Sequence, residues 1–192
     1  MEFQRYIKKY NLKAEKLINF NGPDPEVQYL SHITFQNFMH NKETGENDLH
    51  KLNYEDCCDF IILSQTLEHV YNPFKCVENI YKMLKKDGYF FTSVPVINRL
   101  HEYPYNFVTG FTPIGLASLL DQIGFKVLEV GQWGNRKYCS KLFKSRLWST
   151  EKELKMGITH LGDLKSPFDI FKDGRINEFD YPTQCWALCK KT

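Results

Sequence analysis

The sequence lacks the features by which several classes of protein are first recognised. Its longest apolar runs, such as residues 60–63 and 89–91, are far shorter than the roughly 20 residues that span a bilayer. The six cysteines form no CxxC pair and no regular framework, so we expect reduced thiols in a cytoplasmic protein. Residues 1–9 carry charges where a secretory signal would be apolar. These absences argue against a membrane span, a disulfide scaffold and a secreted protein.

An excess of charge of one sign is also missing, because 25 basic and 23 acidic residues leave a net charge of +2. There is therefore no strong nucleic-acid signal, since such binding draws on a field that displaces counterions. With 192 residues and 42% hydrophobic side chains, the composition predicts a single globular domain over residues 1–192. The aromatic content of 15% is high, and these rings could fill the core or line an apolar or sugar-binding cleft.

Hydrophobic periodicity and turn residues predict alternating helices and strands. The order is helix 2–11, strand 16–20, a brief helix 25–30 with Asp24 as its N-cap, strand 33–38, strand 60–63, a helix from Pro73 to Gly88, strand 89–96, helix 113–123 between Thr112 and Gly124, strand 125–130 and strand 183–190. Residues 135–180 show no clear period and are predicted to be an insertion over one edge or mouth of the sheet. This alternation is typical of an α/β fold with a doubly wound, mostly parallel sheet and helices on both faces.

One segment resembles a known family. Residues 59–88 read DFIILSQTLEHVYNPFKCVENIYKMLKKDG, which resembles the small, type-11-like class I methyltransferases that depend on S-adenosylmethionine. In that pattern an aspartate precedes the fourth strand, LEHV follows it, and a helix ends in LKPGG; here Gly88 would supply the left-handed turn. The similarity continues downstream, in SVP at 93–95, in His101 with Tyr103-Pro104, and in residues 110–125. These segments resemble a bacterial subgroup associated with glycan and small-molecule modification. That subgroup has an arginine at the position that Gly110 occupies here.

The resemblance covers residues 48–135 and, loosely, 183–190. It implies a Rossmann-like class I methyltransferase fold, S-adenosylmethionine as cofactor, and a small-molecule or glycan acceptor. The cofactor would lie across the carboxyl ends of the parallel strands. The loop after the first strand, where the family has several glycines, contains Asn19, Asn21, Gly22 and Asp24. Gly22 would allow close approach of the backbone, and Asp24 would reach the amino group of the cofactor.

Three further segments complete the cofactor site that the resemblance implies. At the end of strand two the family has a carboxylate for the ribose hydroxyls, and here only Asn41 or Glu43 could take its place. Asp48-Leu49 resembles an element that faces the adenine ring, although a solvated loop aspartate is the alternative. After the next strand, backbone groups and small polar side chains would line the cleft, from Ser64, Gln65 and Thr66.

Acid–base candidates follow the same strands. His69 could act as a general base or bind a divalent ion together with Glu68; alternatively, Glu68 caps the next helix and His69 packs in the cleft wall. His101 is the better base candidate, because substrate-covering loops of this fold lie where it does. An oxygen nucleophile would need such a base, whereas an amine needs only to be bound neutral. We assign catalytic roles to His101 and His69, substrate contacts to Glu68, Tyr103 and Tyr105, and no metal.

Two functions follow from these patterns. The first is an S-adenosylmethionine-dependent methyltransferase acting on a small molecule or sugar. The second is a methyltransferase-like binding or scaffold protein without catalysis. Both functions stay open, because the altered glycine loop and the missing strand-two carboxylate are compatible with either. An NAD-dependent oxidoreductase is disfavoured, since no GxGxxG follows the first strand. The basic segment 136–146 could contact an acidic substrate or a membrane surface, or it could be a solvated helix face.

Overall fold

The computed structural model describes residues 2–20, 22, 24–41, 43–102, 104–144, 158–163 and 181–192. Two of the predicted site residues, Asn21 and Tyr103, lie outside this described part. Of the predicted insertion at 135–180, the described residues form one helix and one short strand. Among the described residues, no helix is long and apolar enough to cross a membrane.

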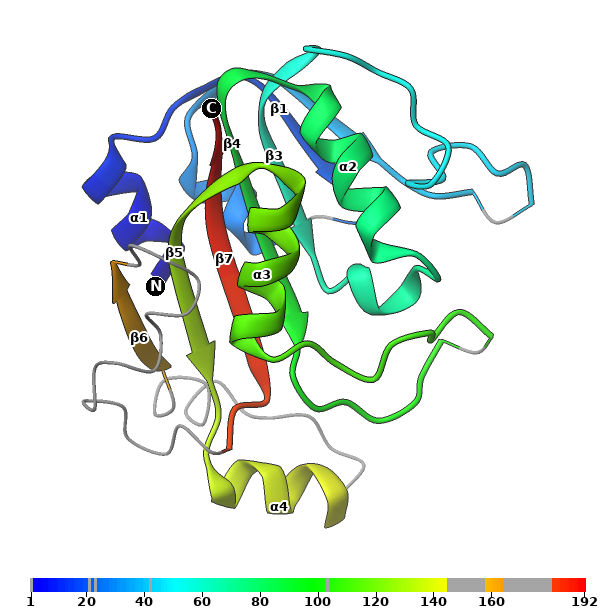
Figure 1. Ribbon diagram of the computed structural model, residues 1–192, viewed down its shortest axis with the longest axis vertical. Coiled ribbons are helices and arrows are strands. Elements are labelled where there is room, and N and C mark those ends of the chain that lie inside the picture. Colours follow the sequence, from blue (N-terminus) through cyan, green and yellow to red (C-terminus); the bar gives the residue numbers. More distant parts are fainter. Residues whose placement is uncertain are drawn as a thin grey trace.

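Helices cover both faces of one sheet (Figure 1). The helices, two of them short 3-10 helices, are α1 (Glu2–Tyr10), η1 (Pro25–Tyr29), η2 (Leu67–His69), α2 (Pro73–Met83), α3 (Pro113–Ile123) and α4 (Arg136–Lys144). The strands are β1 (Ala14–Phe20), β2 (His32–Phe38), β3 (Cys58–Ser64), β4 (Leu84–Pro95), β5 (Phe125–Trp133), β6 (Ile158–Asp163) and β7 (Gln184–Lys191). Within the described residues, the seven strands have the order β2-β1-β3-β4-β7-β5-β6.

The strand order reverses between β1 and β3. The chain passes from β1 outward to β2, then returns to β3 on the other side of β1 and continues to β4, all in parallel pairings. Strand β7 is inserted antiparallel between β4 and β5, and β6 pairs antiparallel with the outer side of β5. The predicted doubly wound α/β class is confirmed. In such sheets ligands bind beside the carboxyl ends of the strands at this reversal, so the topology fixes where a site belongs.

The two faces of the sheet are packed by different helices. Phe60 and Ile62 of β3 belong to the core under α1, where Phe3 meets Phe60 edge-on at 6.0 Å between ring centroids. Ile61 and Leu63 belong to the opposite core, under α2 and α3 (Figure 1). Because both faces of β3 are buried along residues 60–63, this part of the strand is a continuous apolar run with no polar alternation. Strand β3 ends at Ser64 and leads directly into the segment that contains several predicted site residues.

One predicted boundary is wrong. The helix expected to run from Pro73 to Gly88 ends at Met83, and β4 begins at Leu84. Leu84 is fully buried and pairs with Cys58 of β3, so sheet pairing ends the helix earlier than the periodicity suggests. The left-handed turn expected at Gly88 falls instead on Asp87, with φ 66°. Gly88 is needed for space, because a Cβ there would lie 2.9 Å from the carbonyl oxygen of Lys85.

The capping predictions had mixed outcomes. Thr112 caps α3 by accepting a hydrogen bond from the Gly115 amide, and Gly124 ends this helix in the left-handed region at φ 108°. Asp24 occupies the N-cap position of η1 but makes no side-chain cap hydrogen bond. Residues 136–144 do form a helix, α4, as one alternative for the basic segment requires. The described connection between β1 and β2 contains only the five-residue η1, so the first loop has little helix behind it.

Candidate functional site

Two adjoining cavities lie at the carboxyl ends of the strands. The larger, of about 500 Å³, is lined by residues that follow β2 and β3 and by loop residues: Met39, His40, Asn47, Asp48, Leu49, His50, Gln65, Thr66, His69, Val70, Tyr71, Glu102, Tyr105 and Phe107. The smaller, of about 390 Å³, is lined by Gln65, Glu68, His69, Pro95, Ile97, Asn98, His101, Glu102, Thr183 and Gln184. Gln65, His69 and Glu102 line both, so two ligands bound in these cavities would be neighbours.

Gln65, which lines both cavities, is held in an unusual backbone conformation. Its φ is 47°, a left-handed value that is uncommon for a residue with a side chain. The Gln65 amide donates to the carbonyl of Ser93 at 2.8 Å, and its side-chain amide donates to the Ser93 hydroxyl at 3.3 Å. The neighbouring Thr66 hydroxyl donates back to the carbonyl of Ser64 at 2.9 Å. Hydrogen bonds to the carboxyl ends of β3 and β4 therefore fix the loop of Gln65 and Thr66, which reaches both cavities.

The wall of the larger cavity includes an ordered polar turn. Asp48 Oδ1 accepts hydrogen bonds from the His50 ring at 2.8 Å and from the His50 amide at 3.0 Å. Burial opposes the charged form of Asp48, but these hydrogen bonds outweigh it and keep its pKa below the usual range. The His50 ring in turn stacks on Tyr71, with 3.8 Å between centroids and 9° between planes. The predicted residues Asp48 and Leu49 thus line a cavity, and their role toward an adenine ring stays a prediction.

The expected substitutes for the strand-two carboxylate do not line this cavity. Asn41 Oδ1 accepts hydrogen bonds from the amides of Glu43 and Thr44, at 2.9 and 3.1 Å, and so closes a turn. Glu43 is exposed. The cavity wall at the end of β2 is formed by Met39, His40 and Asn47. A polar side-chain contact from this part of the wall would come from the His40 imidazole or the Asn47 amide.

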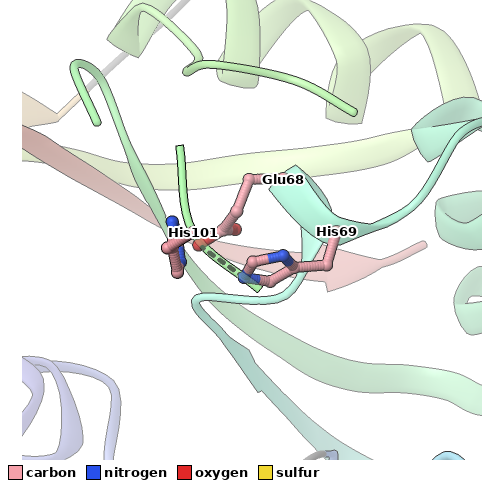
Figure 2. A group of neighbouring side chains, drawn as sticks. All are labelled: Glu68, His69 and His101. Carbon is pink, nitrogen blue, oxygen red and sulfur yellow. Dashed lines mark ion pairs between the residues drawn. The ribbon is translucent and has the colours of Figure 1, made fainter. Parts of the chain in front are cut away.

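Glu68, His69 and His101 form a compact group in the smaller cavity (Figure 2). One ligand atom of each lies within 4.8 Å of the others. Glu68 Oε1 is 3.9 Å from His69 Nε2, and the two imidazole rings meet edge to face with 4.7 Å between centroids. In Figure 2 the Glu68 carboxylate reaches between the two histidines. Glu68 and His69 come from η2, whereas His101 comes from the loop after β4.

Backbone carbonyls determine the proton positions on both imidazoles. His69 Nδ1 lies 2.7 Å from the carbonyl oxygen of Tyr105, and His101 Nδ1 lies 2.9 Å from that of Arg99. A carbonyl oxygen only accepts, so each Nδ1 carries the proton and each neutral ring has its lone pair on Nε2. The 3.4 Å contact from the Asn98 side-chain amide to His101 Nδ1 would need the opposite tautomer. We assign the proton to Nδ1 because its contact with the Arg99 carbonyl is shorter, at 2.9 Å. Both rings are thus set up to accept a proton or a cation.

Glu68 is almost completely removed from solvent. Its residue exposure is 1%, and burial raises the pKa of its carboxyl to about 7. Within the described part of the chain, Glu68 Oε2 is buried and has no hydrogen-bond partner. The backbone carbonyl of Glu68 accepts from the amides of Phe107 and Val108, at 3.0 and 3.1 Å. These bonds join η2 to the loop that carries His101 and keep the three side chains together.

The same loop explains one departure from the family pattern. Gly110 stands where the resembling subgroup has an arginine, and a Cβ on Gly110 would overlap the carbonyl oxygen of Val96. The adjacent Phe111 amide donates to the carbonyl of Pro95 at 2.8 Å. Residue 110 therefore packs directly against the end of β4, and no side chain fits there in this arrangement.

The predicted residues at the end of β1 form a separate group. Asn19 is fully buried, and its side-chain amide donates to the carbonyl of Gly22. Burial and the nearby Glu26 raise the pKa of Asp24 to about 7, although the Ser64 amide and the Asn19 side chain act in the opposite direction. In the described residues, Asp24 Oδ2 is buried without a partner, and a Cβ on Gly22 would meet no atom within 4 Å.

The structure separates the predicted residues into three places. Asp48, Leu49, Gln65, Thr66 and Tyr105 line the larger cavity; Glu68, His69 and His101 line the smaller one; and Asn19, Gly22, Asp24 and Ser64 lie at the ends of β1 and β3, outside the described walls of both. Tyr105 binds His69 through its backbone carbonyl.

Sequence reasoning missed several wall residues. Thr183 and Gln184 line the smaller cavity because β7 is antiparallel, so its first residues lie beside the carboxyl end of β4. The only available signal was the likeness of residues 183–190 to a final strand. His50 and Tyr71 are 21 positions apart in the sequence, and no spacing rule would have joined them. Their stacking depends on how two loops meet.

Comparisons with known proteins agree with the fold and show the family to which the chain belongs. A family model described as a methyltransferase domain matches residues 10–130, more than half of the chain. A methyltransferase from Archaeoglobus fulgidus described as S-adenosylmethionine-dependent has a similar structure, with a TM-score of 0.52 and 15% identity over 98% of this chain and 92% of that one. No curated protein sequence matches.

Two further similar structures contain the cofactor or its product. A Burkholderia thailandensis 1,6-didemethyltoxoflavin-N1-methyltransferase with bound 1,6-didemethyltoxoflavin and S-adenosylhomocysteine has a TM-score of 0.55 and 13% identity over 100% of this chain and 77% of that one. A Haemonchus contortus phosphoethanolamine N-methyltransferase 2 in complex with S-adenosyl-L-methionine has a TM-score of 0.57 and 10% identity, over 99% of this chain and 52% of that one. Identities this low establish a common fold and nothing finer.

Proposed function

Because the chain belongs to the methyltransferase domain family, we propose that it transfers the methyl group of S-adenosylmethionine to a hydroxyl oxygen of a small molecule or sugar. The family, the fold and the cofactor agree with the expectations drawn from the LEHV segment. The choice of an oxygen acceptor rests on one observation: a carboxylate and two imidazoles converge in a cavity that adjoins the proposed cofactor cavity.

The larger cavity and the end of β1 supply groups that suit the cofactor. The half-buried Asp24 carboxylate has one buried oxygen, Oδ2, without a partner in the described residues, and the ammonium of a methionine moiety would provide one. The open space at Gly22 allows a ligand to approach the backbone. The adenosine moiety would then lie in the larger cavity, against Asp48, Leu49 and the loop of Gln65. Both cavity volumes fall in the range of small-molecule sites, about 300–1,000 Å³.

The smaller cavity suits a polar acceptor. Its wall combines Asn98, Thr183 and Gln184 with the group of Glu68, His69 and His101. Gln65 and Glu102 line both cavities, so an acceptor here would lie beside the cofactor. Amide, hydroxyl and carboxylate groups of this kind orient hydroxylated ligands through hydrogen bonds. We therefore place the acceptor in the smaller cavity.

The hydrogen bonds of the two histidines favour the tautomer that suits a general base for an oxygen acceptor. With Nδ1 protonated and bound to a backbone carbonyl, each neutral imidazole can take a proton on Nε2. The acceptor O–H would give its proton to an imidazole as the oxygen bonds to the methyl carbon and the carbon–sulfur bond breaks. When bound, S-adenosylmethionine supplies an already electrophilic methyl group, so the protein mainly aligns the reactants and excludes water.

Calorimetric titration with S-adenosylmethionine and S-adenosylhomocysteine tests cofactor binding. We expect dissociation constants in the micromolar range and a rise in melting temperature, because ligand at 100 times its dissociation constant stabilises the fold by about 2.7 kcal/mol. No heat and no thermal shift at millimolar ligand would contradict the proposal and favour a binding or scaffold role.

The acceptor is then sought with methyl-labelled cofactor and a panel of sugars and hydroxylated metabolites, with amines as the contrasting set. His101→Asn should abolish most of the transfer while leaving cofactor binding intact. The matched control is His32→Asn, because His32 is exposed and lies at the amino end of β2, whereas the site lies at the carboxyl ends of the parallel strands. Transfer to amines alone, with His101→Asn unaffected, would overturn the oxygen assignment.

A further inference from the structure

We propose that Glu68, His69 and His101 form a site for a divalent transition-metal ion of the zinc type, open on one side to the smaller cavity. The site comprises two imidazoles and one carboxylate, each with a ligand atom within 4.8 Å of the other two. Three points this close share a position no more than about 2.8 Å from each of them, whereas zinc bonds to nitrogen and oxygen are about 2.0–2.2 Å. The side chains need to close by less than about 1 Å to bind an ion.

Both imidazoles have the second hydrogen bond that metal-binding histidines use. In such sites the ring nitrogen away from the metal donates to a carbonyl or carboxylate, which fixes the tautomer and the ring orientation. Here His69 Nδ1 is bound to the Tyr105 carbonyl at 2.7 Å and His101 Nδ1 to the Arg99 carbonyl at 2.9 Å. With Nδ1 held in this way, Nε2 is the ring nitrogen that would bind the ion, and His69 Nε2 is 3.9 Å from Glu68 Oε1.

Glu68 supplies an independent argument. Its side chain is 1% exposed, lines the smaller cavity, and within the described residues has an oxygen, Oε2, without a hydrogen-bond partner. Buried carboxylates are ordinarily paired or bound to a cation, because an unpartnered one is costly. The group facing it consists of two imidazoles whose lone pairs cannot donate. A cation bound by all three would satisfy the carboxylate and both rings together.

The ligand types select the class of metal. Imidazole suits zinc and neighbouring transition ions, whereas magnesium and calcium prefer oxygen ligands throughout. Three protein ligands with a remaining open position are typical of catalytic rather than structural zinc sites. The adjoining cavity of about 390 Å³ provides room for water or an acceptor at that open position.

The role of the ion, though not its binding, rests on the proposed function. A divalent ion at this position would lower the pKa of an acceptor hydroxyl, whose proton would leave to water. His69 and His101 would then act as ligands instead of bases. The ion would also join η2 to the loop that carries His101, reinforcing the hydrogen bonds from Phe107 and Val108 to Glu68.

To test this site, the full chain is treated with a chelator to remove bound metal and is then titrated with Co²⁺ while its visible absorption is recorded. Binding of Zn²⁺ is then measured by calorimetry. We expect one ion per chain, displacement of Co²⁺ by Zn²⁺, and no displacement by Mg²⁺. Glu68→Gln and His101→Ala should each weaken binding by at least about tenfold, whereas His32→Ala should bind as the parent does. Circular dichroism and melting temperature identify any variant that does not fold, and the folded one of the pair then decides.

Absence of Co²⁺ absorption, or binding that both folded variants retain, would overturn the metal site. Equal displacement by Mg²⁺ would overturn the assignment to a transition ion. These measurements contain no S-adenosylmethionine, so their failure can be distinguished from failure of the proposed function. A chain that binds the cofactor but no metal would support the proposed function and overturn the metal site. A chain that binds the metal but no cofactor would support the metal site and contradict the proposed function.

Discussion

Replacing Asp24 by asparagine should make the protein more stable and bind its cofactor less well. The pKa of Asp24 is raised from 3.8 to about 7, chiefly by burial and then by Glu26. The folded state therefore favours the protonated carboxyl. That stabilisation is fully present below pH about 4 and is lost as the pH rises through 7, because between these values the folded chain retains a proton that the unfolded chain has released.

The magnitude follows from the shift. About three pKa units at 1.36 kcal/mol each give an upper bound of about 4 kcal/mol for the cost of the Asp24 charge at pH 8. Asp24 is only half-buried, and solvent screening reduces this figure, so we expect about 1–2 kcal/mol. Asparagine has no charge at any of these pH values and nearly the same shape. Asp24→Asn should therefore gain stability relative to the parent as the pH rises from 4.5 to 8.

Urea unfolding at pH 4.5 and pH 8 measures the difference in unfolding free energy between Asp24→Asn and the parent, which we call the stability gap. Comparing the stability gap at the two pH values removes the contributions of other titrating groups. The control is Asp121→Asn, which makes the same substitution at an exposed carboxylate on α3, away from the site. Calorimetry at pH 8 should show cofactor affinity falling by about tenfold or more in Asp24→Asn, since a charge-assisted hydrogen bond is worth about 1.5–3 kcal/mol. An unchanged stability gap would refute the pKa reasoning, and unchanged affinity would refute the role of Asp24 toward the ammonium.

Three other substitutions test the packing that holds the site. Gly110→Ala should destabilise the fold by about 2 kcal/mol or more in urea unfolding, because its Cβ would overlap the Val96 carbonyl; a loss under about 0.5 kcal/mol would contradict this close contact. Tyr6→Phe should cost about 1–3 kcal/mol, because it removes the 3.0 Å acceptor of the buried Trp186 Nε1, and a neutral result would argue that the indole has another partner. Thr112→Ala should lower the melting temperature by an amount equivalent to about 1 kcal/mol through loss of the α3 cap, whereas Thr112→Ser should retain it.

Local sequence patterns determined most of the elements. The buried run of β3, the capped helix α3 with Gly124 after it, and the alternation of strands with helices all follow from short-range preferences, and the structure agrees with them. The end of α2 does not follow from such preferences. Residues 84–88 continue a plausible helix, and only the pairing of Leu84 with Cys58 turns them into the start of β4.

The candidate site shows the same division. The sequence alone identified His69, Glu68 and His101 as chemically significant, because a family pattern and their residue types pointed to them. Only the tertiary structure placed them within 4.8 Å, since the loop after β4 folds back onto η2 through hydrogen bonds to the Glu68 carbonyl. It likewise brought Thr183 to the smaller cavity by running β7 antiparallel beside β4. Residue types follow from local chemistry, whereas their convergence depends on contacts between segments far apart in the chain, which no local periodicity encodes.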